Sequence, residues 1–105
     1  MQTHGRYATL AAEVIAAHPV TDPLFLYMAF QNSHAPYQCP DQYTDMYPDL
    51  PRNGSRNCFN AMVTALDESV GVIVDSLKSA ALYDNTVIVY SSDNGGPARE
   101  SNNMP

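Results

Sequence analysis

The sequence has few basic residues and no long apolar run, and both absences exclude classes of function. Only five of its 105 residues are Lys or Arg, and the formal net charge is -6. Such a chain offers no basic stripe to neutralise the phosphates of a nucleic acid. No stretch approaches the ~18 apolar residues that span a bilayer, and the first residues lack the apolar core of a signal peptide. We therefore expect neither a nucleic acid partner nor a membrane span.

Cysteine is also scarce, which leaves the redox compartment open. Cys39 and Cys58 flank a loop and are candidates for a disulfide, but two thiols in a chain of this size are equally compatible with a reduced compartment. Asn53 begins an Asn-Gly-Ser sequon in the same loop and is a candidate glycosylation site. Together these signals favour a lysosomal or secreted protein.

The composition and the apolar spacing predict one small globular domain with two helices. Hydrophobic residues make up 45% of the chain and charged residues 15%, a balance typical of a packed core. Apolar residues at helical spacing predict a helix over residues 5–17. A longer helix, capped by Asn57 or Ser55, follows the loop. Its predicted core face consists of Phe59, Met62, Val63, Leu66, Val70, Ile73, Val74 and Leu77.

Two continuous apolar runs, residues 24–30 and 86–90, predict strands that are buried on both faces. A long loop over residues 37–55 and the second helix separate these runs. The order strand, loop, helix, strand is that of a βαβ unit, with parallel strands and a right-handed crossover. The predicted fold class is therefore α/β.

Polar side chains follow each predicted strand. His34 comes after the first strand, and Asp93 and Asn94 come after the second. Since the carboxyl ends of parallel strands meet at one edge of a sheet, we expect these side chains to converge. Asp93 and Asn94 offer the oxygen ligands that Ca²⁺ or Mg²⁺ prefers, and a histidine beside such a cation can protonate the leaving oxygen of an oxyanion ester. Asp-Asn-Gly-Gly is also a common turn, and a histidine after a strand is often a hydrogen-bonded loop residue, so the residues alone leave both interpretations open.

Three segments, in this order, resemble the central part of a sulfatase. They are PLFLYMAFQNSHAPYQCP (residues 23–40), MVTALDESVG (62–71) and NTVIVYSSDNGG (85–96). Within the sulfatase family they are most similar to the arylsulfatase B, I and J branch. The resemblance implies an alkaline phosphatase-like α/β sandwich and a sulfuric ester hydrolase acting on an aryl sulfate or a sulfated sugar, above all N-acetylgalactosamine 4-sulfate of glycosaminoglycans. It also implies that residues 1–105 are an internal fragment of the catalytic domain.

The resemblance assigns roles to individual residues. It implies that His34, in a His-Ala-Pro sequence, protonates the leaving oxygen, and that Asp93 and Asn94 ligate Ca²⁺. The family's nucleophile is a formylglycine made from the cysteine of a Cys-x-Pro-x-Arg segment, and neither Cys39 nor Cys58 lies in one. Two further metal-binding aspartates and a Lys-x-His motif are also missing. We therefore expect one active-site histidine, half of a calcium site, and no activity from this chain alone.

Two other functions stay open. A phosphoesterase of the alkaline phosphatase superfamily shares the metal site beside a strand, but attacks with Ser or Thr and uses extra His and Asp ligands. A noncatalytic sulfatase-like protein would only bind sulfated glycans, and the acidic balance of the chain disfavours such polyanions.

Overall fold

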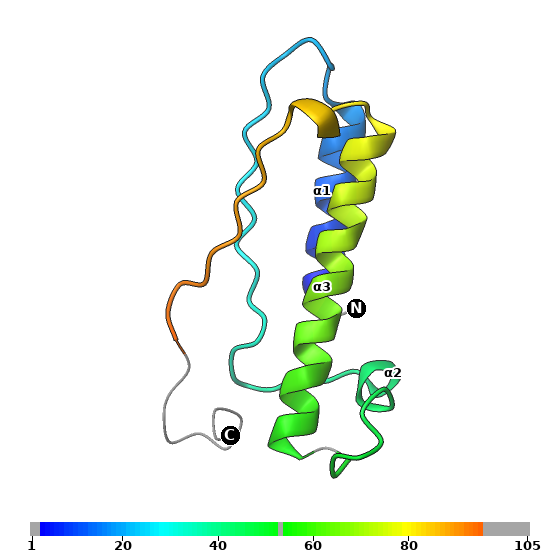
Figure 1. Ribbon diagram of the computed structural model, residues 1–105, viewed down its shortest axis with the longest axis vertical. Helices are drawn as coiled ribbons and strands as arrows, with labels where there is room; N and C mark the ends of the chain where they lie inside the picture. Colours follow the sequence, from blue (N-terminus) through cyan, green and yellow to red (C-terminus); the bar gives the residue numbers. More distant parts are fainter. Residues whose placement is uncertain (1–2, 53, 96–105) are drawn as a thin grey trace. The chain divides into compact units, whose positions relative to one another are not determined.

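The computed structural model describes residues 3–52 and 54–95, and its regular elements are helical (Figure 1). In chain order they are α1 (Thr3–Ala17), α2 (Asp41–Thr44), α3 (Ser55–Ser79) and the 3-10 turn η1 (Tyr83–Asn85). Within the described ranges, no helix combines the length and the apolar character needed to cross a membrane.

The chain divides into two compact units. Unit 1 comprises Met1–Asn32 with Thr64–Thr86, and unit 2 comprises Ser33–Val63 with Val87–Pro105. Unit 1 therefore holds α1 and most of α3, whereas unit 2 holds α2 and the first two turns of α3. The candidate residues His34, Asp93 and Asn94 all belong to unit 2.

The predicted first helix is confirmed as α1. It ends at Ala17, because the residue before a proline is disfavoured in helical geometry and Pro19 follows His18. Ala8, Ala11 and Ile15 are its buried residues, and their spacing of three and four places them on one face.

The second predicted helix is confirmed as α3, and its predicted core face is confirmed in part: Met62 and Leu77 are buried, but Val63 is not. The helix begins at Ser55, so Asn57 lies inside it rather than at its cap. Among its most buried residues are the small Ala61, Ala65 and Ser69, whereas Val63 is 42% exposed. The hydroxyl of Ser69 donates to the carbonyl of Ala65 at 2.9 Å, so its burial leaves that donor satisfied.

The core of unit 1 combines small side chains with the larger Ile15 and Leu77. Ala8 and Ala11 of α1 and Ala65 and Ser69 of α3 are all buried. The distance between packed helices is set by the side chains at their contact, and residues of this size permit a close approach. Of the larger apolar residues of α1, Ile15 is fully buried, whereas Leu10 and Val14 are 46% and 50% exposed.

The first predicted strand is extended but unpaired, so the prediction of a sheet strand at residues 24–30 is wrong for this structure. Side chains alternate along the segment as they would in a strand: Leu26 and Met28 are half-buried, whereas Phe25 and Tyr27 are 92% and 80% exposed. The segment and α1 line a groove of about 340 Å³. Phe30 meets Tyr7 of α1 edge to face, with ring centroids 6.4 Å apart.

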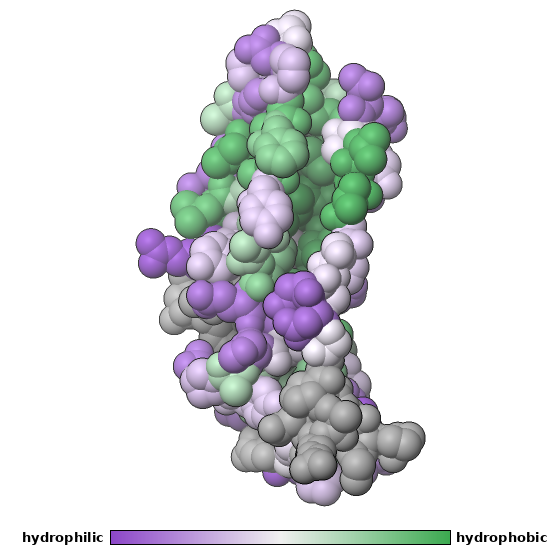
Figure 2. All heavy atoms as spheres, turned by 90° about the vertical axis from the view of Figure 1, so that its left-hand side faces the viewer, coloured by the Kyte–Doolittle hydropathy of each residue, from purple (hydrophilic) through white to green (hydrophobic). Residues whose placement is uncertain are grey.

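The second predicted strand, residues 86–90, is also extended and unpaired. Val87, Val89 and Tyr90 are between 76% and 90% exposed. Figure 2 shows that apolar side chains remain open to solvent on the face that it draws. A strand buried on both faces needs hydrogen-bonded neighbours and covering side chains, and the described residues supply neither. The predicted α/β class and its βαβ unit are therefore not formed within the described part of the chain.

Substitution of Gly71 by alanine is predicted to stabilise the protein. Gly71 lies within α3, and a Cβ atom built there meets no atom within 4 Å. Alanine removes the entropic cost of a helical glycine, so Gly71→Ala should raise the free energy of unfolding by about 1 kcal/mol. Urea denaturation followed by circular dichroism measures this change.

Gly54 provides the matched control. A Cβ atom at Gly54 would lie 2.9 Å from the backbone oxygen of Pro51, so Gly54→Ala should lower stability. A destabilising Gly71→Ala substitution would contradict the helix described here.

Candidate functional site

His34 lies in the turn that follows the first extended segment, and its side chain is exposed. Its Nδ1 donates to the carbonyl oxygen of Ala35 at 2.7 Å. This hydrogen bond holds one ring nitrogen, so the other, Nε2, is the atom available for proton transfer to a ligand. The peptide bond between Ala35 and Pro36 is cis.

Asp93 and Asn94 form a tight local turn after the second extended segment. The backbone N–H of Asn94 donates to Asp93 Oδ1 at 2.9 Å. The carboxamide Nδ2 of Asn94 donates to the Gly95 carbonyl at 2.7 Å. These bonds match the turn interpretation of the sequence, and within residues 3–52 and 54–95 they do not use Asp93 Oδ2 or the carboxamide oxygen of Asn94, the atoms that could bind a ligand.

The oxygen donors fit a calcium ion in kind but not in number. Ca²⁺ takes about six to eight oxygen ligands, and Asp93 and Asn94 supply a minority of them. In the part of the chain that the structure describes, no group of three His, Cys, Asp or Glu residues is placed to hold a metal. No hydrogen bond or ion pair joins His34 to Asp93 or Asn94 among the described residues, so their convergence over one cation stays a prediction.

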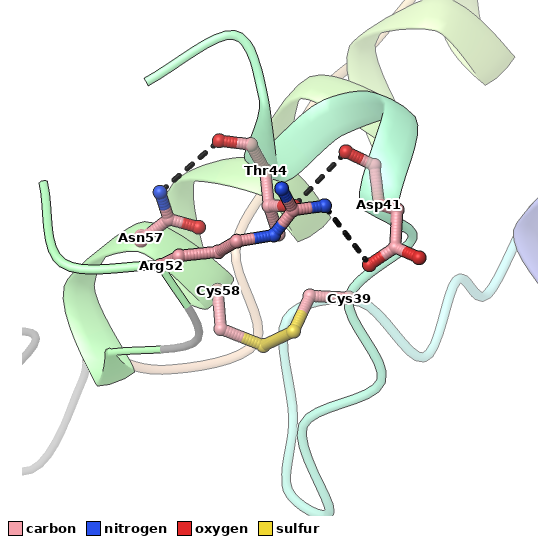
Figure 3. The surroundings of a disulfide bond; sticks show 6 residues. All are labelled: Cys39, Asp41, Thr44, Arg52, Asn57 and Cys58. Atoms are coloured by element: carbon pink, nitrogen blue, oxygen red, sulfur yellow. Dashed lines mark hydrogen bonds and ion pairs between the residues drawn. A yellow bond between two sulfur atoms is a disulfide. The ribbon is translucent and has the colours of Figure 1, made fainter. Parts of the chain in front are cut away.

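The two cysteines are joined: Cys39 and Cys58 form a disulfide across a sequence separation of 19 residues (Figure 3). Their Cα atoms lie 5.1 Å apart, within the range that a disulfide spans. The bond ties the residues after His34 to the start of α3. We call residues 39–58 the cystine loop. The candidate glycosylation site Asn53 lies outside the described residues.

Asn57 is a second cross-link of the cystine loop. Its side chain is only 1% exposed, and its Nδ2 donates to the carbonyl oxygens of Thr44 at 3.1 Å and Tyr47 at 3.2 Å. The carboxamide of Asn57 thus holds Thr44, at the end of α2, and Tyr47, in the turn that follows, close to the start of α3. Its Oδ1 is buried and has no hydrogen-bond partner among the residues that the structure describes.

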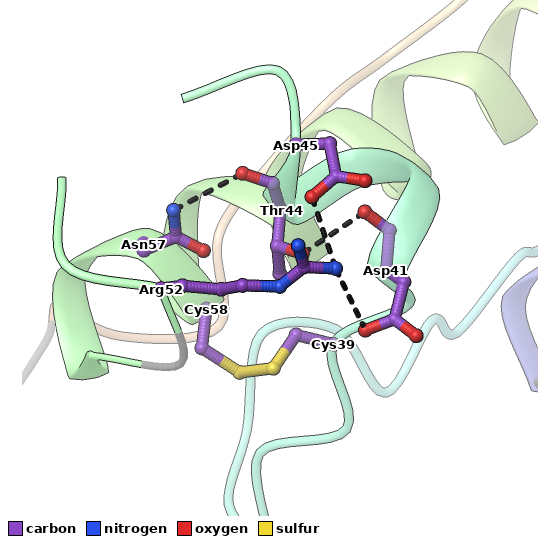
Figure 4. Close-up of polar contacts among 7 residues, drawn as sticks. All are labelled: Cys39, Asp41, Thr44, Asp45, Arg52, Asn57 and Cys58. Carbon is purple, nitrogen blue, oxygen red and sulfur yellow. Dashed lines mark hydrogen bonds and ion pairs between the residues drawn. A yellow bond between two sulfur atoms is a disulfide. The ribbon is translucent and has the colours of Figure 1, made fainter. Parts of the chain in front are cut away.

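Arg52 is a third cross-link. Its guanidinium lies 3.1 Å from a carboxylate oxygen of Asp45 and 3.7 Å from one of Asp41 (Figure 4). All three side chains are more than half exposed, so water screens these pairs and each contributes at most about 1 kcal/mol. Closing a loop of this length by a disulfide is worth about 3 kcal/mol, so the covalent bond is the stronger restraint.

Sequence reasoning treated residues 37–55 as an irregular loop and missed α2, Arg52 and the role of Asn57. Arg52 is the only basic residue among the three aspartates of this stretch, a charge pattern that points to such pairing. Asn57 directly precedes Cys58, so the disulfide also holds Asn57 close to the residues that follow Cys39. The buried carboxamide had no signal of its own, because burial depends on the folded loop.

Comparison with known proteins identifies sulfatases among the relatives of this chain. The profile of the family described as Sulfatase matches residues 4–105. Arylsulfatase J of Mus musculus is 39% identical over 100 residues, which is 94% of this chain and 17% of the relative. N-acetylgalactosamine-6-O-sulfatase of Bacteroides thetaiotaomicron is 32% identical over 81% of the chain and 15% of the relative. Human N-acetylgalactosamine-6-sulfatase is 31% identical over 85% of the chain and 16% of the relative.

The chain thus spans about a sixth of the length of these relatives. No solved structure matches it.

Replacing Asn57 by alanine is predicted to destabilise the protein. The substitution removes two hydrogen bonds and leaves the buried carbonyls of Thr44 and Tyr47 without those donors. The expected loss in the free energy of unfolding is about 1–3 kcal/mol, measured by chemical denaturation. The same replacement at the exposed Asn85 is the control and should change stability by less than about 0.5 kcal/mol. Equal effects at both positions would show that the carboxamide does not hold the loop.

Proposed function

The chain belongs to the sulfatase family, and from this premise we propose that it forms part of a sulfuric ester hydrolase that acts on sulfate esters of N-acetylgalactosamine. The observation that carries the proposal is the family match over residues 4–105, which includes His34, Asp93 and Asn94. Because the chain covers a small part of its relatives, the activity is proposed for the whole protein and not for these residues alone.

His34 is the proposed general acid. Its Nδ1–H is held by the Ala35 carbonyl, so the imidazolium form presents its second proton on Nε2. A proton delivered from Nε2 to the ester oxygen prevents the build-up of alkoxide charge as the bond to sulfur breaks. The exposed position of His34 leaves room for a bulky sugar to reach this nitrogen.

Asp93 and Asn94 are the residues proposed to hold Ca²⁺, through Asp93 Oδ2 and the carboxamide oxygen of Asn94. Sulfatases generally use Ca²⁺ together with a formylglycine. When bound, the cation offsets negative charge on the sulfate oxygens. Both cysteines of this chain are in the disulfide, so neither is available as the formylglycine precursor. The chain's own contribution is the acid and part of the metal site.

The substrate and the location are the finer parts of the proposal. Two of the relatives are named for a 6-sulfate of N-acetylgalactosamine, while the sequence resemblance pointed to the 4-sulfate, so the shared sugar is the better-supported feature. A disulfide persists in oxidising compartments, which supports the proposed lysosomal or secreted location.

A chimera tests the catalytic role of His34. Arylsulfatase J of Mus musculus, with its matching segment replaced by this chain, is predicted to hydrolyse a chromogenic aryl sulfate. His34→Ala in that chimera should lower kcat by about 100-fold to 10,000-fold, because the leaving oxygen departs unprotonated. Turnover of 4-sulfated and 6-sulfated N-acetylgalactosamine then compares the two substrates.

His18→Ala is the matched control in the same chimera. His18 Nε2 donates to the Asp22 carbonyl at 3.0 Å in unit 1, so its loss should leave kcat unchanged. A chimera that cleaves aryl phosphates in preference to aryl sulfates would favour the phosphoesterase alternative. Equal kcat for the His34 and His18 variants would remove His34 from catalysis.

Calcium dependence tests the metal ligands. In the chimera, Asp93→Ala is predicted to raise the Ca²⁺ concentration needed for half-maximal activity at least tenfold, because the anionic ligand is lost. Asp84→Ala, at an exposed aspartate of η1, should leave that concentration unchanged. Titration of EDTA-treated enzyme with Ca²⁺ gives the measurement, and an unchanged requirement in Asp93→Ala would exclude Asp93 as a ligand.

A further inference from the structure

The cystine loop has almost no hydrophobic core of its own. Among its described residues, Tyr43 and Cys58 are the buried hydrophobic ones, and Met46 is 59% exposed. Burial of apolar surface is the main favourable term in folding, and here it is small. Other restraints must therefore keep the loop closed.

Polar contacts are among the noncovalent restraints of the loop, and one of them carries a cost. Arg52 pairs with two carboxylates in an exposed setting, where ion pairs contribute little. Asn57 supplies two hydrogen bonds, whereas its buried Oδ1 has no partner among the described residues. An unsatisfied buried acceptor destabilises the closed loop, so it offsets part of the stabilisation that the two hydrogen bonds of Asn57 provide.

The disulfide is the strongest restraint on the closed loop. One of its two cysteines is also partly accessible to solvent. Cys58 is 4% exposed, whereas Cys39 is only half-buried. Thiol–disulfide exchange requires that a thiolate reach one of the two sulfurs. Cys39 is therefore the more accessible of the two cysteines to an external thiol.

We propose that the Cys39–Cys58 disulfide is a redox-sensitive latch, whose reduction by a small thiol opens the cystine loop while unit 1 stays folded. Two thiol molecules each contribute one electron and one proton. The bond between Cys39 and Cys58 breaks to give two cysteine thiols, and the small thiols leave as their own disulfide. This device is independent of the proposed function, although Cys39 follows His34 by five residues, so opening also frees one end of the segment that carries this histidine.

Hydrogen exchange of the full 105-residue chain tests the latch. The oxidised protein and the protein equilibrated with glutathione are compared by mass spectrometry, and alkylation of free thiols measures the extent of reduction. Backbone hydrogen bonds protect amides of the loop in the oxidised form, including those of Thr44 and Tyr47. Reduction should accelerate exchange of peptides from residues 41–52 roughly a hundredfold, the factor expected for loss of a cross-link of this length. Peptides from α1 should keep their protection, and reoxidation should restore that of the loop.

Two variants separate the latch from its neighbours. Cys39→Ser combined with Cys58→Ser should reproduce the reduced form without any thiol present. Arg52→Ala, which removes the ion pairs but keeps the disulfide, should exchange like the oxidised parent. Loop exchange in Arg52→Ala as fast as in the double variant would overturn the proposal, because the latch would then be electrostatic.

Three other outcomes would also contradict the proposal. Cysteines that stay oxidised in glutathione would show that a small thiol does not reduce this disulfide. A reduced loop that keeps its protection would show that the polar contacts suffice to close it. Loss of protection in α1 on reduction, or in the double variant, would mean that the bond supports the whole fold, which also contradicts a local latch.

Discussion

A helix satisfies its backbone hydrogen bonds within one segment, whereas an extended segment depends on a neighbour, and this difference governs the structure. α1 and α3 form because each closes its own hydrogen bonds and buries a stripe of side chains. Residues 24–30 and 86–90 carry the composition of buried strands but find no partner strand among the described residues. Alternate side chains of the first segment are therefore exposed, as are most side chains of the second.

The cystine loop is held closed by a covalent bond. It has little apolar surface to bury, so a disulfide, one buried carboxamide and an exposed arginine take the place of a core. Of these, the disulfide restrains the unfolded chain most, because it removes the entropy of closing the loop. α2 is short enough that it relies on this closure for its position.

The candidate site is limited by the same missing neighbours. His34 and the pair Asp93 and Asn94 each follow an extended segment, and a parallel sheet is what would bring such strand ends together. Without that sheet, each keeps only local hydrogen bonds, and two oxygen-bearing side chains leave most positions of a Ca²⁺ ion unfilled. The sulfatase family is recognised from the sequence of this chain, while the residues that the structure describes do not assemble a metal site by themselves.

The sequence by itself determined both long helices, since their apolar spacing and the proline after Ala17 are local signals, and it determined the family through its three motifs. Only the tertiary structure decided which residues of α3 are most buried: Ala65 and Ser69 join the predicted Met62 and Leu77, whereas Val63 is exposed, because burial depends on what lies opposite. It also decided between bridged and reduced cysteines, and it left the predicted strands unpaired. Pairing and burial are properties of neighbours distant in the chain, which no local pattern contains.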